Sequence, residues 1–423
     1  MRIHTLIALF LLDSVSAQAS FVVDASGGPG SQFLSIQAAV QAVPSGSVLV
    51  VRAGSYSPVY IDGKGLAILC DAGAAIAAQP SFLVNGPFLT VRNTQPSQVV
   101  TVSGLGCGPV GAQFHDGILV EDAMGPVVLD GRGATVQPRS LGLVATLRIT
   151  NSSQVVIRDY ELRGGLLLNF SSAPVPEVCC VVGDSAVVFE SCLLRGSDSF
   201  GSSDQLRFGR AALAATNSRI ELVATRVLGG NGVATVGLSG PLQMLADPAV
   251  IATNAQLVAR GGAAEAIAGG IAPATATQPS VQLDAIAGTG SLRIDPAIPV
   301  AGAVASSVLV STVPNARLTS NVPLLGGSAA ATCTGTSGSL IVVALGEPSL
   351  ASPFPGLSDP LWLGASNSFV VDFGVASAAG EFAVAVPLPG QTGLRGIAFV
   401  WQAAQLGPFS VAALSNPSAT VIR

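Results

Sequence analysis

Residues 150–165 read TNSSQVVIRDYELRGG, residues 183–197 read GDSAVVFESCLLRGS, and residues 216–230 read TNSRIELVATRVLGG. Aligning Ile157 with Phe189 and Leu222 places these stretches 32 and then 33 residues apart. Self-similarity at a fixed period is the signature of a repeat architecture. Each unit reads as short strands that end in a glycine turn, without the 3.6-residue apolar period of a helix. The sequence therefore predicts a solenoid of β-strands.

The same alignment predicts which side chains are neighbours in successive repeats. In a solenoid each residue lies beside its equivalent in the next repeat. We therefore expect Ile157, Phe189 and Leu222 to stack as one internal apolar column.

The N-terminus predicts export. Arg2 is followed by an apolar run over residues 6–12 and by small residues up to residue 19, which is the pattern of a cleaved secretory signal. We assign the signal peptide to residues 1–17. The run is too short to span a bilayer, and polar residues, glycine and proline interrupt every later apolar stretch. We expect a secreted or cell-surface protein with no membrane span.

The composition narrows the class of partner. The formal net charge is −5 and the pI is about 5.0, which argues against nucleic acid and anionic membranes, because their phosphates need clustered cations. Hydrophobic residues make up 49% of the chain and charged residues 10%, so disorder is not expected. We expect a monomer.

The cysteines leave two alternatives open. None of the six forms a CxxC pair with the spacing of a metal site, so zinc is set aside. In an exported chain Cys70 could pair with Cys107, and Cys192 with Cys179 or Cys180. Alternatively these residues are buried free thiols that pack as small hydrophobes. Cys333, which has no partner in its own domain, is expected to be a core residue.

A short amphipathic helix is expected near the N-terminus. Apolar residues recur at helical spacing from Ile36 to Val43, Ser35 can serve as the N-cap, and Pro44 ends the run. A solenoid needs such an element because its first repeat would otherwise expose apolar core and unpaired strand edges.

The order of elements around this helix resembles a known family. DxSGG, the helix SIQAAVQAVPSG, the strand VLVVRAG, and then SYSPVYIDGKG and LAIL occupy residues 21–75. This order is similar to the opening of right-handed parallel β-helix proteins of the pectin lyase-like superfamily, pectin methylesterases in particular. The resemblance implies a right-handed coil with three parallel sheets and, in many relatives, action on acidic or neutral polysaccharides.

The catalytic motifs of that superfamily do not occur in the repeats. The QDT and DFIFG-like segments of pectin methylesterases, the NTD, DD, GHG and RIK motifs of polygalacturonases and the RxPxxR pattern of pectate lyases are missing. No catalytic residue is therefore carried over from the family. His115, the sole histidine after signal removal, is interpreted as part of a polar turn.

Composition and pattern divide the chain near residue 300, where SLRIDPAIPVAG brings two prolines. We predict an all-β fold, in which residues 18–300 form a right-handed parallel β-helix, or solenoid, with a short N-terminal capping helix. Residues 301–423 contain short strands parted by Gly, Pro and Ser, which predicts a small C-terminal β-sandwich for capping, attachment or secretion.

Candidate functional residues lie where each repeat ends. A long insertion follows the equivalent glycine of every repeat, so the insertions should form a wall along one edge, and function is expected beside that wall. Two carboxylates there could act as acid and base or bind calcium, and two arginines could hold a uronate carboxylate. The alternative is an ordered surface loop held by its own ion pairs. The middle insertion carries these weak catalytic candidates: Asp198, Asp204, Arg207 and Arg210.

The register also places charged side chains over one another. Arg163 should lie over Arg195, and two guanidinium groups one repeat apart repel unless an anion lies between them. One hypothesis is that Arg163 and Arg195 are substrate-binding residues with an anionic glycan between them. The alternative is that each side chain is solvated separately. Arg158 should lie over Glu190 in a surface ion pair of little energetic weight.

These features lead to three hypotheses. None of the features establishes an enzyme. The first is an exported β-helix protein that binds extracellular or cell-surface polysaccharide without catalysis. The second is a polysaccharide lyase or hydrolase that acts on a uronate-containing glycan. The third is a structural or adhesive surface rod. We expect no metal and no cofactor other than the calcium named above.

Overall fold

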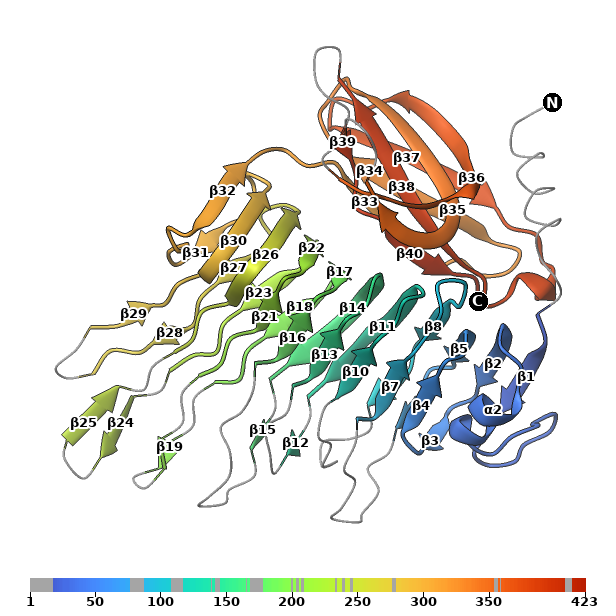
Figure 1. The fold of residues 1–423 in the computed structure, drawn as a ribbon, viewed down its shortest axis with the longest axis horizontal. Coiled ribbons are helices and arrows are strands. Elements are labelled where there is room, and N and C mark those ends of the chain that lie inside the picture. Colours follow the sequence, from blue (N-terminus) through green and yellow to red (C-terminus); the bar gives the residue numbers. More distant parts are fainter. Residues whose placement is uncertain are drawn as a thin grey trace.

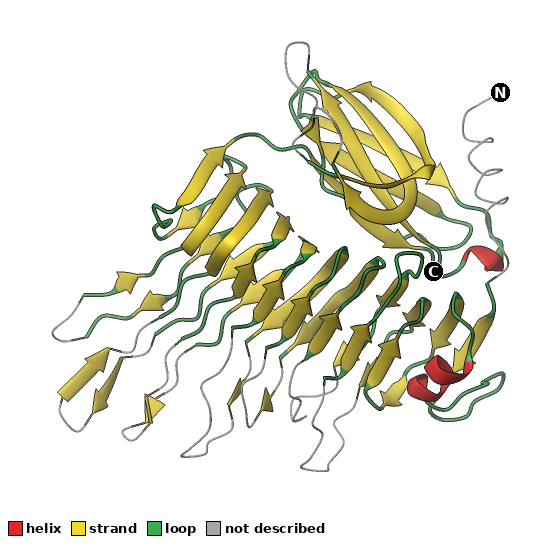
Figure 2. Ribbon diagram, in the orientation of Figure 1, coloured by secondary structure: helices red, strands yellow, loops and turns green. Residues whose placement is uncertain are grey.

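The chain folds into a long parallel β-sheet and a separate antiparallel β region (Figure 1). Figure 2 shows strands through most of the described chain. The computed structural model describes residues 18–76, 87–107, 117–137, 139–140, 145–164, 166–167, 178–198, 201–202, 205–206, 209–232, 234–237, 240–243, 246–275, 279–353, 357, 359–407 and 413–423.

The parallel sheet is built from strands whose inward apolar residues are buried in one continuous core. It contains β1 (Ser20–Val23), β2 (Ser47–Val51), β4 (Val59–Asp62), β5 (Leu66–Cys70), β7 (Leu89–Arg92), β8 (Val100–Ser103), β10 (Ile118–Glu121), β11 (Val127–Val136), β13 (Leu147–Thr150), β14 (Val155–Arg163), β16 (Cys180–Gly183), β17 (Ala186–Glu190), β18 (Leu193–Arg195), β21 (Leu213–Thr216), β22 (Arg219–Val223), β23 (Arg226–Leu228), β26 (Val250–Arg260), β27 (Ile267–Ala268), β30 (Ile286–Ile294), β31 (Val300–Ala301) and β32 (Val308–Thr312).

Smaller pairings lie beside this sheet. Three short strands form a second parallel sheet: β3 (Gly54–Tyr56), β6 (Ala74–Ile76) and β9 (Gly106–Cys107). A further parallel pair joins β12 (Arg139–Ser140) and β15 (Leu166–Leu167). Antiparallel hairpins join β19 (Gly201–Ser202) with β20 (Gln205–Leu206), β24 (Ala234–Gly237) with β25 (Gly240–Gln243), and β28 (Ile271–Ala272) with β29 (Val281–Gln282).

The predicted register of the repeats is confirmed. Ile157 of β14 pairs with Phe189 of β17, and Phe189 pairs with Leu222 of β22. All three side chains are buried in one continuous apolar core. Side chains one repeat apart in the sequence are therefore direct neighbours across the sheet.

In the repeats from β7 to β26, one turn is made by an Asn or Asp residue with positive φ. Asn151 has φ 47° and Asp122 has φ 51°, a left-handed conformation that short polar side chains tolerate better than others. The side chains also bond between repeats, because Asn151 Nδ2 donates to Asp122 Oδ1 at 2.7 Å. Asn217 Nδ2 donates in the same way to Asp184 Oδ1 at 3.2 Å. These bonds hold successive turns in register.

The N-terminal helix is confirmed as α2 (Ile36–Ala42). Ser35 is its N-cap, and its hydroxyl oxygen accepts a hydrogen bond from the backbone N–H of Ala38. The ammonium group of Lys64 donates to the carbonyl oxygens of Val40 and Val43, which satisfies carbonyls that a helix C-terminus leaves free. One apolar face of α2 is buried in the core of the parallel region. Among the described residues, no helix has the length and apolar character that a membrane span requires.

The antiparallel region consists of two sheets that share one apolar core, which includes Trp401 and Leu318. The three-stranded sheet contains β33 (Arg317–Ser320), β34 (Ser328–Thr334) and β37 (Glu381–Pro387). The second contains β36 (Leu361–Val375), β35 (Leu340–Ser352), β38 (Ala398–Leu406), β39 (Ala413–Leu414) and β40 (Ser418–Val421). The 3-10 helix η1 (Thr392–Leu394) precedes β38.

The change from parallel to antiparallel pairing comes later than the sequence suggested. Strand β32 still pairs in parallel with β30, and antiparallel pairing begins at β33. The two prolines near residue 300 lie between β30 and β31, within the last repeat of the parallel sheet. They mark a turn of the sheet, and the boundary lies between residues 312 and 317.

The antiparallel region packs on an outward face of the parallel sheet. Valines of β11, β14, β17 and β22 form an apolar cluster with Trp362, Leu363 and Val400. Both Arg158 and Glu190 are buried in this contact. Arg158 Nη1 donates to the Ala419 carbonyl at 2.9 Å, and the hydroxyl of Ser418 donates to Glu190 Oε1 at 2.7 Å.

The prediction that Arg158 and Glu190 form a surface ion pair is therefore wrong. The two residues are in register as predicted, but both lie inside the contact between the two regions. The repeat alignment reports only which residues are neighbours within the sheet. It carries no information on what covers the outward face.

A second buried charge cluster lies in the same contact. Asp359 is within 2.9 Å of Arg219 and 3.3 Å of Arg260, and it also accepts a hydrogen bond from Arg293. Glu221 pairs with Arg219 at 3.1 Å and with Arg260 at 3.4 Å. One carboxylate of the antiparallel region thus holds three guanidinium groups of the parallel sheet.

Candidate functional site

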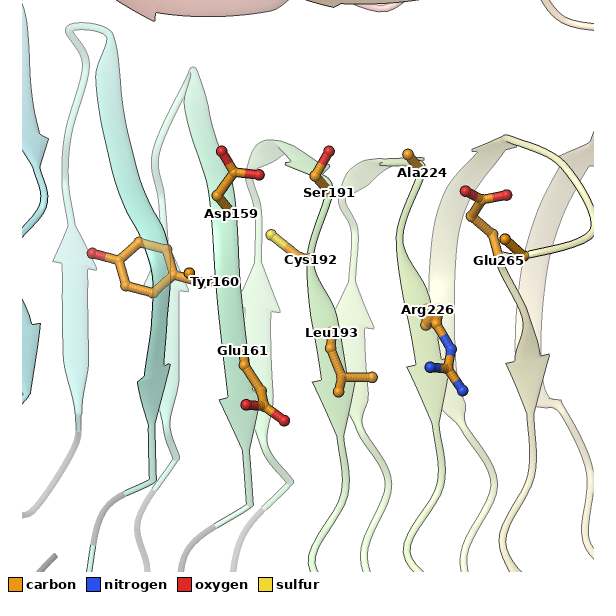
Figure 3. Close-up of a pocket in the computed structure, with 11 residues that line it drawn as sticks. Asp159, Tyr160, Glu161, Ser191, Cys192, Leu193, Ala224, Arg226 and Glu265 are labelled. Carbon is orange, nitrogen blue, oxygen red and sulfur yellow. The ribbon is translucent and has the colours of Figure 1, made fainter. Parts of the chain in front are cut away.

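An open groove of about 430 Å³ crosses neighbouring strands of the parallel sheet (Figure 3). Its polar side chains come from the second half of β14, from β23, and from the connections that precede β18 and follow β26. The groove is lined by Gly133, Asp159, Tyr160, Glu161, Ser191, Cys192, Leu193, Ala224, Arg226, Ala264 and Glu265.

The register sets out these side chains in rows. Glu161 pairs with Leu193, and Leu193 pairs with Arg226, so one row crosses three strands along the groove. Neighbouring strands in a sheet lie about 4.8 Å apart, which fixes the spacing of the row. A parallel row starts with Arg163, which pairs with Arg195 as the sequence predicted. The two sequence-predicted arginines therefore lie next to the groove.

Each of these arginines has a carboxylate from its own repeat. Arg163 Nε and Nη2 donate to Glu161 Oε1 at 2.8 and 2.6 Å. Arg195 Nη2 donates to Asp198 Oδ2 at 2.9 Å. The expected repulsion between Arg163 and Arg195 is therefore compensated inside the protein, so the stacked pair needs no external anion.

Of the four candidates in the middle insertion, the structure describes Asp198 and Arg210, and Asp198 bonds to Arg195 beside the groove. Asp198 accepts hydrogen bonds from Arg195 and, at 2.9 Å, from the backbone N–H of Asn231. Arg210 bonds through its backbone to Ser197 and Gly230. Burial raises the pKa of Asp247, and the nearby positive charge of Arg210 partly opposes this shift. The remaining candidates, together with the turn histidine, lie outside the described residues: Asp204, Arg207 and His115.

Two groove carboxylates that the sequence reasoning missed have opposite environments. The hydroxyl of Thr135 donates to Glu161 Oε2 at 2.7 Å, and this bond, with the contact to Arg163, holds the pKa of Glu161 below its usual range. Burial raises the pKa of Asp159, although Arg158 Nε at 3.4 Å opposes the shift. Figure 3 shows the two side chains pointing in opposite directions along β14. They do not converge on one substrate atom, which an acid and base pair would require.

The other charged groups complete the groove. Glu265 accepts a hydrogen bond from the backbone N–H of Gly262 at 2.6 Å, which fixes the turn after β26. Arg226 is exposed, and among the residues that the structure describes it has no ion-pair partner. Its guanidinium group is therefore available to a ligand. The signal for this row was the alternation of outward residues in YELR, LLR and RVL, which the sequence analysis did not follow.

The cysteines resolve the two alternatives for the described thiols. Cys70, Cys179, Cys180, Cys192 and Cys333 are free and buried, and the side chain of Cys107 lies outside the described residues. Burial raises the pKa of Cys192, which lies at the groove, to about 12. This thiol is protonated at neutral pH and is a poor nucleophile.

Within the described ranges, no group of three or more His, Cys, Asp or Glu side chains is placed to hold a metal ion. A scan against models of known protein families gave no match, and a search of curated proteins found no similar sequence. The site must therefore be interpreted from its own geometry.

Proposed function

We propose that the chain is an exported β-helix protein that binds extracellular or cell-surface polysaccharide along the groove, without catalysis. In this proposal the parallel region is a right-handed parallel β-helix of the pectin lyase-like kind. The antiparallel region is a β-sandwich docked on its side.

The observation that carries the proposal is an open groove along which an acidic, an apolar and a basic side chain lie in one row. Glu161, Leu193 and Arg226 follow one another at the strand spacing, and Asp159 and Ser191 accompany them at the neighbouring turns. A row of side chains that crosses several strands suits an extended ligand that contacts each of them in turn. An open groove, unlike a closed cavity, lets such a ligand extend beyond the site.

The charges of the groove favour a hydroxyl-rich neutral glycan over a polyuronate. The three carboxylates of the groove are balanced by Arg226 and by the arginines that pair with Asp159 and Glu161, so the groove offers a polyanion no net positive charge. Ionised carboxylates accept hydrogen bonds, and sugar hydroxyls donate them. Arg226 supplies donors, and the Leu193 side chain supplies apolar surface between them.

Binding can be tested with purified protein and a panel of soluble neutral and uronate-rich glycans, by affinity electrophoresis and titration calorimetry. Hydrogen bonds to charged groups contribute about 1.5–3 kcal/mol, so Arg226→Ala and Glu161→Gln should each weaken binding by roughly ten- to a hundred-fold. The matched control is Arg92→Ala. Arg92 is an exposed arginine of β7 that pairs with Asp62 at 3.2 Å, away from the groove.

Each outcome decides between the hypotheses. Binding that both groove variants weaken and Arg92→Ala leaves unchanged supports the proposal. Failure to bind any glycan, or equal losses in all three variants, would overturn it in favour of a structural rod. Release of reducing ends or of unsaturated products would show catalysis and favour the lyase or hydrolase.

A further inference from the structure

The parallel sheet ends in a strand with an open edge. Strand β32 pairs with β30 on one side, and no described strand pairs with its other side (Figure 1). The backbone N–H of Val313 donates to the Ile294 carbonyl of β30. Because successive N–H groups of a strand alternate in direction, those of Val310 and Thr312 point away from the sheet.

The apolar core is also open at this end. One inward column runs through the sheet by direct pairing and ends at Val310. Its earlier members are all buried to within 2% exposure: Leu66, Val100, Val127, Val155, Val187, Ile220, Leu257 and Leu292. Val310 is 52% exposed, and its outward neighbour Leu309 is 76% exposed. The column stops at Val310 without the second apolar neighbour that the members from Val100 to Leu292 have.

The last repeat lacks the charged side chains that often protect an edge. Natural proteins place lysines or other charges on exposed edge strands to prevent pairing. Residues 296–316, which include β31 and β32, contain no charged side chain. A partner that covers this end must itself be uncharged there, because a charge buried against it would have no counter-ion.

The opposite end of the sheet is closed. Helix α2 covers the core there, and residues 32 and 33 bond to the outer edge of β1. The backbone N–H groups of Gln32 and Phe33 both donate to the carbonyl of Val22, and the Gln32 side chain accepts from the N–H of Val22. A head-to-tail stack of two chains would therefore place the open edge of one against a covered edge of the other.

We propose that a second copy of this chain covers the open end, with β32 of one copy pairing with β32 of the other about a two-fold axis. The same uncharged strand then occurs on both sides of the contact, so no charge is buried and both apolar columns gain a neighbour. This proposal replaces the expectation of a monomer, which took no account of the sheet end.

Sedimentation velocity of the purified full chain over a range of concentrations tests the proposal. The wild-type protein should form a dimer. Val310→Lys places like charges face to face across the axis, so it should weaken the dimer by about a hundred-fold or more. The matched control is Val370→Lys, because Val370 of β36 is also 52% exposed but lies in the antiparallel region.

Thermal melting of each variant shows whether it folds, and Leu309→Lys replaces Val310→Lys if the latter does not. A wild-type dimer that the folded β32 variant dissociates and Val370→Lys leaves intact supports the proposal. A wild-type protein that stays monomeric at every concentration overturns it. Loss of the dimer in Val370→Lys alone, or open-ended polymers in place of dimers, also overturns it.

Discussion

Replacing Asp359 by asparagine should loosen the contact between the antiparallel region and the parallel sheet. Asp359 is 2% exposed and lies 2.9 Å from Arg219 and 3.3 Å from Arg260. Burial alone would raise the pKa of this carboxyl, but the guanidinium groups of Arg260, Arg293 and Arg219 together hold it below its usual value. The carboxylate is therefore ionised at neutral pH and joins the two regions.

The magnitude follows from these distances. At an effective dielectric constant of about 20, unit charges 3.3 Å apart attract by ~5 kcal/mol. Desolvation offsets much of this attraction, and removing one partner of a buried ion pair costs about 3–5 kcal/mol because the remaining charges lose their compensation. In Asp359→Asn, Arg219 and Arg260 would keep Glu221 as a partner, and Arg293 would lose its bond to the carboxylate. We expect the docking equilibrium to fall by roughly two to three and a half orders of magnitude.

The two tryptophans make this loss observable. Trp362 is buried against the valines of the parallel sheet, whereas Trp401 lies in the core of the antiparallel region. Urea unfolding should be followed by tryptophan fluorescence and by far-UV circular dichroism. In Asp359→Asn the fluorescence change should precede the loss of the parallel sheet. In the wild-type protein it should occur at higher urea.

Asp372→Asn is the control, because Asp372 is an exposed carboxylate of β36 in the same region. A surface change of this kind should alter stability by no more than about 0.5 kcal/mol. If Asp359→Asn shifted the fluorescence midpoint no further than Asp372→Asn, desolvation would already cancel the attraction. The charge cluster would then contribute nothing to docking.

Three more outcomes are expected. The pKa of Asp359 is lowered in the folded protein, so its contribution to stability is complete above its ordinary pKa of 3.8 and is lost as the pH falls through its folded pKa. Burial raises the pKa of Glu190, so its contribution to stability is complete below its ordinary pKa of 4.5 and is lost as the pH rises through its folded pKa. Docking stability, followed by Trp362 fluorescence, should therefore rise from pH 7 to about 4.5 and fall below 3.8; a steady decline from neutral pH would contradict this. Phe189→Asp should abolish folding, because it buries an unpaired charge in the internal column, and export with a wild-type melting curve would refute the register. Iodoacetamide at pH 8 should label the buried thiols only after denaturation, since burial raises the pKa of each to about 12, and rapid labelling of the native protein, read by mass spectrometry, would contradict their burial: Cys70, Cys192 and Cys333.

The register of the parallel sheet could be predicted because local residues encode it. Turn residues such as Asn151 and Asn217, and inward residues such as Phe189, recur at the repeat period. In a stacked sheet that period alone determines which residues are neighbours. The pairing of Arg163 with Arg195 could therefore be predicted from the sequence alone.

Contacts between distant parts of the chain could not be predicted in this way. The partners of Arg158 in the antiparallel region, Ser320 and Ala419, are more than 150 residues away, and no repeat relates them. The end of the parallel sheet was placed too early because prolines in a turn of the last repeat resembled a boundary. The groove was not predicted because the site was expected beside the long insertions, whereas its charged groups lie within and beside the strands.

The parallel sheet has two charged outward faces whose sequences look alike but whose roles differ. On the face formed by the first half of β14 and by β17, Arg158 and Glu190 are buried and bonded to the antiparallel region. On the face formed by the second half of β14 and by β18 and β23, Glu161 and Arg226 stay open to solvent. The antiparallel region buries the charges of the covered face, so they are not accessible to a ligand. Because its guanidinium is exposed and without a described ion-pair partner, Arg226 is the residue at which ligand binding should be sought first.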